Sequence, residues 1–140
     1  MRPSFPQYGI LLAKVASLRS EDIHTKAGCV AFDQNWYSLG TFYNGFLPKQ
    51  NIGPEIWEDR DAKNKMVIHS ESWLVSRTNA GSVYRVCLNI SPCSKCSISL
   101  VTHGVKEVYF ELEYHREQEF KDIFKFYNIE YKQVSVDEWI

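Results

Sequence analysis

The spacing of hydrophobic residues changes along this chain between a helical and a strand period, and the order of the changes predicts the fold. Near the start, apolar side chains recur every three to four positions and predict an amphipathic helix over residues 5–20: Tyr8, Leu11, Leu12, Val15 and Leu18. The next two runs, GCVAF and WYSLGTFY, are rich in residues that favour strands. Because the polar DQN lies between them, these runs predict a β-hairpin.

The second half of the chain alternates between helix and strand signals. We expect a helix over about residues 70–79 and then a strand at YRVCLNI. The next helix is strongly marked, since Ser91 is a favourable cap, Pro92 suits the first turn and Gly104 suits the position after the end. A strand is expected at VKEVYFEL. Before a final strand at IEYKQV, apolar residues at helical spacing predict one more helix: Phe120, Ile123, Phe124 and Tyr127.

This order of elements, α-β-β-α-β-α-β-α-β, predicts an α/β class fold, a three-layer α/β/α sandwich around a central mixed five-stranded sheet. The last three strands are joined through helices, so we expect them to be parallel with right-handed crossovers. Residues 1–140 are expected to form a single domain, because no repeat or linker divides them. Residues 44–65 are turn-rich and charged and predict a long loop, a kind of segment that is usually functional or else disordered.

Charge and composition exclude several classes of protein. The formal net charge is −1, so the basic surface of a polynucleotide-binding protein is not expected. No apolar run reaches membrane-spanning length, and the first residues lack a signal-peptide pattern. A cytoplasmic location is therefore expected, with no membrane partner. Thiols stay reduced there, and a disulfide framework is not expected.

The cysteine pair in SPCSKC is the first candidate for chemistry. Zinc takes four ligands in a structural site, or three with an open position in a catalytic one, and Cys93 and Cys96 supply two. A second C-x-x-C is absent, and Cys29 and Cys87 lie in strand-like apolar runs that favour a core role. A redox dithiol and a purely structural zinc site stay open as alternatives.

A histidine and a glutamate complete the pattern. His69 lies in VIHSESW, at the start of a predicted helix, with Glu71 two residues on. H-x-E followed by P-C-x-x-C is the signature of zinc deaminases that act on cytosine or adenine rings. The signature gives His69, Cys93 and Cys96 as zinc ligands and Glu71 as the general acid/base. Three protein ligands leave zinc a fourth position for a water whose pKa falls towards neutrality.

With these residues, the sequence resembles the deoxycytidylate (dCMP) deaminases of the cytidine deaminase superfamily, and it is similar to virus-encoded members. The resemblance runs from about Tyr8 to Val134 and rests on SLRSEDIHTKAGCVAFD, YNGFLP, VIHSESW, SPCSKC and HGVKEVYFELEYH. It implies the cytidine-deaminase fold, one Zn²⁺ per chain and conversion of dCMP to dUMP and ammonia, which supplies thymidylate synthesis. It also implies a small nucleotide substrate, a homo-oligomer that is a hexamer in the family, and a host-cytoplasmic location for a viral chain.

The resemblance also implies which residues bind the substrate. Asn44 of YNG corresponds to the residue that hydrogen-bonds the sugar or the base, although NG is also a common turn dipeptide. The backbone N–H of Ser70 and the carbonyl of Ser91 would read the cytosine edge. Tyr114 matches an aromatic residue near the base. A 5′-phosphate would be met by donors from RSEDIHTK: Arg19, Ser20, His24 and Lys26.

The chain departs from the family pattern at three places. Ser70 replaces the usual alanine between the histidine and the glutamate, and DIH replaces DPN. Phe42 replaces the first glycine of GYNG, a region that in related enzymes binds dCTP as activator or dTTP as inhibitor. Phe42, Tyr43 and Gly45 are therefore the candidates for a regulatory triphosphate site, with Mg²⁺ as a possible companion ion of the triphosphate.

Two other readings of the same residues stay open. A deaminase of this fold could act on dCTP, a free nucleoside, a pterin or guanine ring, or an antibiotic. Loss of Arg19 or Lys26 would distinguish a nucleotide enzyme from a nucleoside enzyme. The chain could also be a catalytically silent, zinc-bound nucleotide sensor, although such a sensor has no need of Glu71.

Overall fold

A mixed five-stranded sheet forms the centre of the computed structural model, which describes residues 1–140. The strands lie in the order β2-β1-β3-β4-β5. β1 pairs antiparallel with both β2 and β3, whereas β3, β4 and β5 run parallel. The predicted hairpin and the predicted parallel strands are thus both confirmed. The strand bounds are β1 Gly28–Phe32, β2 Ser38–Tyr43, β3 Arg85–Ile90, β4 Glu107–Leu112 and β5 Glu130–Gln133.

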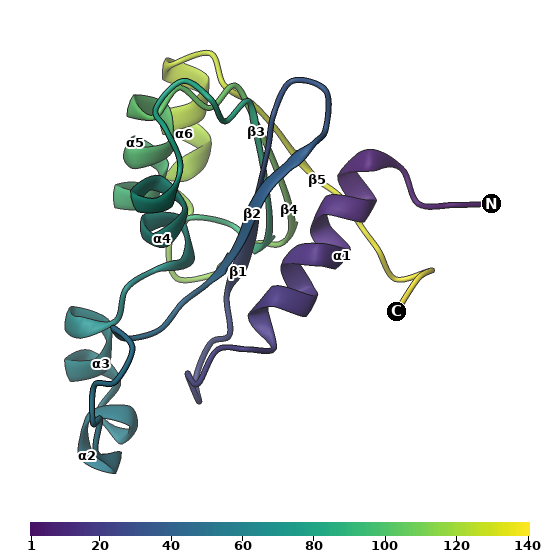
Figure 1. The fold of residues 1–140 in the computed structure, drawn as a ribbon. Helices are drawn as coiled ribbons and strands as arrows, with labels where there is room; N and C mark the ends of the chain where they lie inside the picture. The colour runs from purple at the N-terminus through teal and green to yellow at the C-terminus, as the bar shows by residue number, and fades with distance from the viewer.

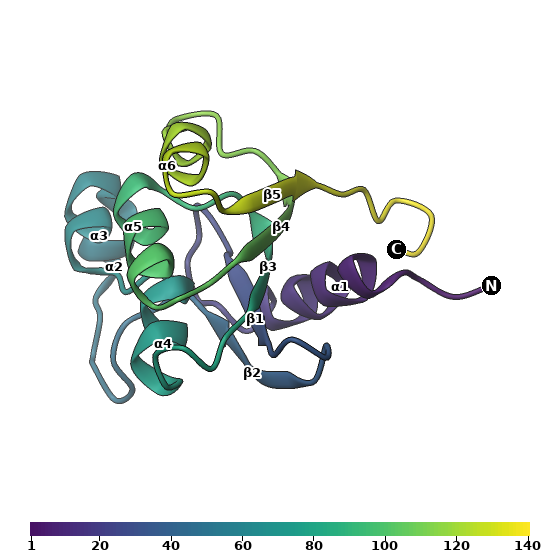
Figure 2. The same cartoon turned by 90° about the horizontal axis from the view of Figure 1, so that it is seen from above.

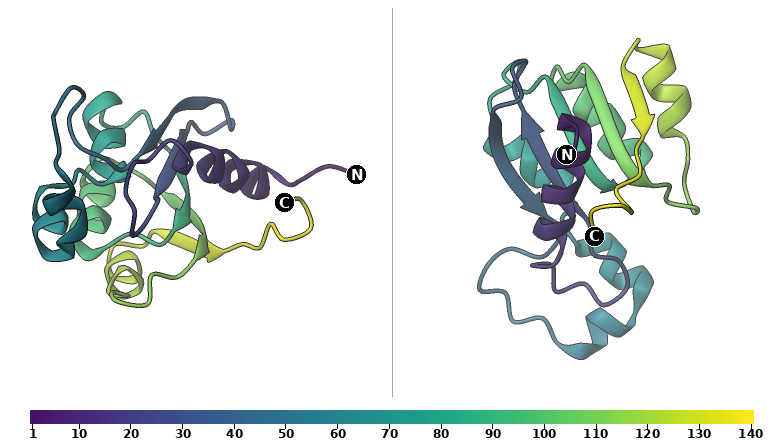
Figure 3. Two further views of the ribbon diagram at one scale, coloured as in Figure 1. Left: turned by 90° about the horizontal axis from the view of Figure 1, so that it is seen from below. Right: turned by 90° about the vertical axis from the view of Figure 1, so that its right-hand side faces the viewer.

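Helices cover both faces of this sheet, as predicted (Figure 1). α1 lies alone against one face, and α4, α5 and α6 cover the other, which the views from above and from the side show clearly (Figures 2 and 3). No helix has both the length and the apolar character needed to cross a bilayer. The helix bounds are α1 Phe5–Ser17, α2 Pro54–Glu58, α3 Arg60–Met66, α4 Ser70–Arg77, α5 Ser94–Thr102 and α6 Phe120–Phe126.

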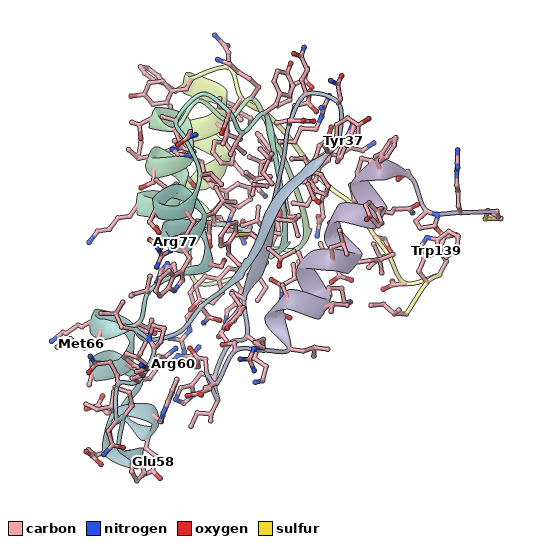
Figure 4. All side chains as sticks on the ribbon, viewed as in Figure 1. Tyr37, Glu58, Arg60, Met66, Arg77 and Trp139 are labelled. Atoms are coloured by element: carbon pink, nitrogen blue, oxygen red, sulfur yellow. The ribbon has the colours of Figure 1, made fainter.

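Each face of the sheet has its own hydrophobic core. Under α1, the core includes Ile10, Phe32 and Val136, and the C-terminal Trp139 packs beside it (Figure 4). On the other face, Leu74 of α4 and Leu100 of α5 are fully buried in a larger cluster. Truncating such a leucine typically costs 2–5 kcal/mol, at the order-of-magnitude level. These contacts therefore fix the two helices whose N-terminal ends carry the candidate site.

The boundaries of two predicted helices move for local reasons. α1 ends at Ser17 instead of residue 20. α5 begins at Ser94, because Cys93 is the residue that caps it and its sulfur accepts a hydrogen bond from the Cys96 N–H. The prediction that Ser91 caps this helix was wrong. Gly104 lies at φ +94°, in the left-handed region that suits the position after a helix end, as predicted.

The predicted long loop of residues 44–65 contains two short helices, α2 and α3, which the sequence pattern did not reveal. Gly53 and Pro54 begin α2, and the Asp59 carboxylate caps α3 by accepting from the Ala62 N–H. Figure 1 shows this pair projecting beyond the sheet, at the end where α4 begins. We call α2 and α3 together the arm. Because α3 leads into α4 through three residues, the arm lies next to the start of that helix.

Candidate metal and substrate site

Two helix starts bring a histidine and two cysteines together. His69 precedes α4 as its cap residue, Cys93 precedes α5 in the same way, and Cys96 lies in the first turn of α5. The His69 Nδ1 atom is 3.3 Å from the Cys96 Sγ and 3.6 Å from the Cys93 Sγ. All three ligand atoms lie within 4.8 Å of one another. One imidazole nitrogen and two sulfurs at this spacing fit a zinc ion with a fourth position left open.

The local sequence places these atoms beyond the C-terminal end of the central strand β3. β3 ends at Ile90, and Ser91 and Pro92 lead directly into the cap of α5. Pro92 lacks the N–H that a continuing strand would donate, so the pairing of β3 with β4 ends here. The His69 side is fixed by a single β-bridge in which Gly45 and Ile68 exchange two hydrogen bonds of 3.0 Å.

The three side chains of this group change one another's pKa through their mutual hydrogen bonds. The hydrogen bond with Cys96, followed by the one with His69, lowers the pKa of the Cys93 thiol. The same contact with Cys93 raises the pKa of Cys96, because the pair shares one proton. The bond to Cys93 raises the pKa of His69 in spite of its burial. A soft divalent metal would take the place of these protons.

Glu71 lies beside the three ligands and is 5% exposed. Burial raises the pKa of its carboxyl, and the hydrogen bond from Ser70 acts in the opposite direction. In that bond the Ser70 hydroxyl donates to Oε1 of Glu71 over 2.6 Å. A carboxyl whose pKa is raised above its usual value is better suited to hold and pass on a proton than an ordinary exposed carboxylate. The hydroxyl that distinguishes this chain from the usual alanine therefore contacts the candidate acid/base directly.

A cavity opens over these residues and encloses about 580 Å³ of free space, its open mouth included. It joins six of the predicted site residues: Asn44, His69, Glu71, Ser91, Cys93 and Tyr114. The remaining lining residues are Asp22, Thr25, Ala27, Lys63, Asn64, Val67 and Ile90. The end of β3, the segments before β1 and after β2 and β4, the arm and two helix starts all contribute to the lining. The sequence-predicted residues thus come from segments far apart along the chain.

Asn44 is held by a buried polar network. Its amide nitrogen donates to Asp22 Oδ2 over 3.2 Å and to the Thr25 carbonyl over 2.9 Å. Its side-chain oxygen accepts from the Ala27 N–H over 2.9 Å. Lys63 donates to the same Asp22 oxygen over 2.8 Å. The amide orientation is therefore fixed, and one lone pair of its oxygen remains for a ligand.

The opposite wall is a strap formed by the loop after β4. The Tyr114 N–H donates to the Ser91 hydroxyl over 2.8 Å, and this bond holds the tyrosine at the cavity. The Glu117 carboxylate accepts from the Ser94 N–H at the start of α5 over 2.6 Å. Bonds from Ser94 hold the pKa of Glu117 below its usual value. The strap thereby connects the ring of Tyr114 to the helix that bears both cysteines.

The basic segment near the start is placed differently from the sequence expectation. Arg19 lines a separate surface hollow with Tyr43 and Gly45, outside the cavity of Glu71. Ser20 is buried, and its hydroxyl donates to the Asn44 carbonyl over 2.9 Å. The Lys26 ammonium donates to the Ser20 carbonyl. None of these three lines the cavity.

The candidates for regulation gather on the exposed side of β2. Phe42, Tyr43 and Gly45 line another hollow together with Trp73 and Arg77 of α4. The ring of Phe42 covers Gly40, where an added Cβ would meet it. Arg77, which Figure 4 labels beside α4, lies over the Trp73 ring, 5.5 Å from its centroid.

Among the lining residues that the sequence did not suggest, two are charged, Asp22 and Lys63. Asp22 lies in the segment RSED, and its composition alone is typical of a solvated helix end. Lys63 is one of several lysines in a charged stretch, and nothing in the sequence separates it from Lys65. Burial distinguishes them, since Lys63 is buried and Lys65 is exposed.

With this geometry established, comparison with known proteins identifies the family. The sequence model of the cytidine and deoxycytidylate deaminase zinc-binding region matches residues 4–112. The chain belongs to the cytidine and deoxycytidylate deaminase family.

Three individual proteins are similar to this chain. A probable deoxycytidylate deaminase of Caenorhabditis elegans is 33% identical over 104 residues, which cover 71% of this chain and 53% of that protein. Deoxycytidylate deaminase of Saccharomyces cerevisiae is 26% identical and covers 99% of this chain and 47% of the yeast protein. The chain spans about half the length of these two relatives. The dCMP deaminase of the cyanophage S-TIM5, solved with dCMP and dUMP, superposes with a TM-score of 0.81 at 22% identity and covers 96% of this chain and 99% of the phage chain. This superposition confirms the predicted fold.

Proposed function

We propose that this protein is a zinc-dependent hydrolase that converts dCMP to dUMP and ammonia. The observation that carries the proposal is the buried Glu71 beside the His69, Cys93 and Cys96 group, in one cavity that is open to solvent. Membership of the family and relatives named deoxycytidylate deaminase support the same chemistry. One zinc ion per chain accounts for the three ligands, and its chemistry when bound is to lower the pKa of a water.

Glu71 would move both protons of the reaction. The water oxygen forms a bond to C4 of the cytosine ring, and the C4–N bond to the amino group breaks. Of the two water protons, one passes to ring N3 and the other to the departing amine, which leaves as ammonia. A carboxyl with a raised pKa is suited to accept each proton and release it. Ser70 would hold this carboxyl in place through its 2.6 Å hydrogen bond.

Two backbone groups are available to recognise the base. The Ser70 N–H is in the first turn of α4 and makes no hydrogen bond within the protein, nor does the Ser91 carbonyl. Such a donor and acceptor match the carbonyl O2 and the amino group of cytosine. Asn44, with one free lone pair, would bind the sugar, and Tyr114 would lie near the ring. The side chains of both serines serve the protein itself, since they bond to Glu71 and to the Tyr114 N–H.

Regulation and assembly belong to the same proposal. The hollow of Phe42, Tyr43 and Gly45 is the place where dCTP or dTTP would bind, and it lies on the exposed edge strand β2. A homo-oligomer, hexameric as in related enzymes, would cover part of this edge, because an unpaired edge strand is normally protected.

Ammonia release from dCMP by the zinc-loaded protein tests the proposal. CMP, dCTP, deoxycytidine and guanine are measured alongside, and added dCTP or dTTP at low dCMP tests regulation. We expect dCMP to be the best substrate. Release from guanine or deoxycytidine alone would assign the site to another member of the fold, and zinc binding without any release would favour a nucleotide sensor.

A further inference from the structure

The cavity contains one residue with a permanent positive charge, and it is not one of those that the sequence suggested. Lys63 lines the cavity from the arm, whereas Arg19 and Lys26 do not line it. A 5′-phosphate is a dianion that needs charged or polar donors within hydrogen-bond distance. The buried Lys63 is therefore the candidate partner of a 5′-phosphate in this cavity.

Lys63 has donors to spare. Its ammonium carries three N–H groups, and the structure records one hydrogen bond, to Asp22 Oδ2. The side chain is 4% exposed, so bulk water does not readily satisfy the other two. A buried donor without a partner is costly, which indicates that something else in the cavity accepts from it.

Asp22, in contrast, does not depend on Lys63 alone. Its Oδ1 accepts from the N–H groups of His24 and Thr25 over 2.8 and 3.1 Å. Its Oδ2 accepts from Asn44 as well as from Lys63. With these donors the carboxylate stays ionised, and its pKa is lowered although burial acts the other way. The ammonium is thus positioned by Asp22 and still available to a second anion.

The position along the cavity fits the phosphate of a nucleotide. Lys63 and Asn44 bond to the same carboxylate oxygen, so the ammonium is a neighbour of the residue that would bind the sugar. The 5′-phosphate is attached to that sugar. Two neutral side chains that are able to donate hydrogen bonds also line the cavity, Thr25 and Asn64.

We infer that Lys63 binds the 5′-phosphate of the substrate and that Asp22 holds it in position, with Thr25 and Asn64 as additional donors. This inference rests on the proposed function, because it names the residue that makes the same site prefer a nucleoside monophosphate to a nucleoside. The arm would then provide substrate specificity, while the helix starts provide the chemistry.

Calorimetric titration with dUMP and with deoxyuridine tests Lys63 without requiring turnover. In the zinc-loaded protein dUMP should bind more tightly than deoxyuridine. Lys63→Met should weaken dUMP binding about 10- to 100-fold, the value of a hydrogen bond to a charged group, and deoxyuridine binding less than about threefold. Lys65→Met removes an exposed lysine from the same helix and should change neither affinity.

A double variant separates phosphate binding from support of the fold. Lys63→Met alone leaves Asp22 as a buried carboxylate without its cation, which is itself destabilising. Asp22→Asn with Lys63→Met removes both charges. If the preference for dUMP stays lost in the double variant, Lys63 binds the phosphate. If the preference returns, or if Lys63→Met weakens both ligands equally, the lysine only supports the cavity and the inference is wrong.

Failure of this inference is distinguishable from failure of the proposed function. Tight, Lys63-dependent dUMP binding without ammonia release from dCMP would reject the reaction and keep the phosphate site. Release of ammonia from dCMP and deoxycytidine with equal efficiency, and equal affinity for dUMP and deoxyuridine, would keep the reaction and reject the phosphate site.

Discussion

Helices α4 and α5 lie side by side, and their two ends are built on opposite principles. At their N-terminal ends, the ligand atoms of His69, Cys93 and Cys96 lie within 4.8 Å of one another and could hold a metal ion. At their C-terminal ends, the Thr78 hydroxyl donates to the Leu74 carbonyl and accepts from His103 Nε2. One end is left open for a ligand, and the other is closed by its own hydrogen bonds.

The histidines at the two ends, His69 and His103, differ in the direction in which their pKa is shifted. The bond to Cys93 raises the pKa of His69, whereas burial lowers the pKa of His103. His103 caps the end of α5, where the helix dipole would favour a cation, so burial is the stronger effect there. A cation is therefore favoured at the first histidine and disfavoured at the second. A titratable side chain becomes a functional group where its neighbours are themselves charged, and remains structural where they are neutral.

Removal of the carboxyl at the open end should have the largest effect on activity. Glu71→Ala should lower kcat about 10³- to 10⁴-fold, because it removes the carboxyl beside the candidate zinc ligands that would carry both protons. Zinc content, measured by atomic absorption, should stay at one per chain. Glu71→Gln, which keeps the shape and the contact with Ser70, should be equally inactive. Substantial activity in either variant would remove Glu71 from the shuttle role.

Removal of a candidate zinc ligand should lower both the metal content and the stability of the protein. Cys93→Ala should lose zinc and several kcal/mol of stability, roughly, since a metal bound to the native state stabilises it. Urea unfolding and metal analysis measure the two effects together. Cys87→Ala, a buried cysteine outside the group, should keep zinc. A stoichiometric metal content in Cys93→Ala would mean that the ligand assignment is wrong.

At the C-terminal ends of α4 and α5, the contribution of His103 to stability should depend on pH and not on zinc. His103→Leu should cost about 1 kcal/mol of unfolding free energy at pH 7.5, the value of its hydrogen bond to Thr78. Because the folded-state pKa of His103 lies below 6.5, the unfolded chain binds more protons, and wild-type stability falls as the pH drops through that range. The cost of the substitution should therefore shrink below pH 6.5.

Urea unfolding over a pH series measures this change, with the exposed His115→Leu as the control. A cost that stays constant from pH 7.5 to acid would show that the proton affinity of His103 does not contribute to stability. Kinetic constants should be the same in both variants.

The smallest effect is expected at Ser70. Ser70→Ala restores the residue usual in the family and removes the 2.6 Å hydrogen bond to Glu71. We expect kcat to fall about threefold, because one hydrogen bond that only orients a group contributes little, while KM stays the same. A rise in KM with unchanged kcat would place Ser70 in substrate binding instead of in the support of Glu71.

Much of this architecture could be predicted from local patterns. The hairpin of β1 and β2 and the parallel strands β3 to β5 follow from runs of strand-favouring residues and from the helices between strands. The arm could not, since α2 and α3 bury few apolar side chains and their sequence is dominated by charged and turn-forming residues. The start of α5 was misplaced because Ser91 and Cys93 are both able to cap, and the sulfur of Cys93 bonds the helix N–H while Ser91 bonds the strap.

The sequence by itself predicted the candidate chemistry, because residues that suit zinc ligands and an acid/base, in the patterns H-x-E and P-C-x-x-C, follow one another at the starts of two helices. Only the tertiary structure decided which cation shares their cavity. The sequence does not distinguish between four basic residues that lie in polar segments: Arg19, Lys26, Lys63 and Lys65. Their difference lies in burial and in partners, and a buried charge requires a compensating carboxylate from a distant segment. Asp22 reaches Lys63 across 41 positions of the chain, a pairing that no local pattern contains.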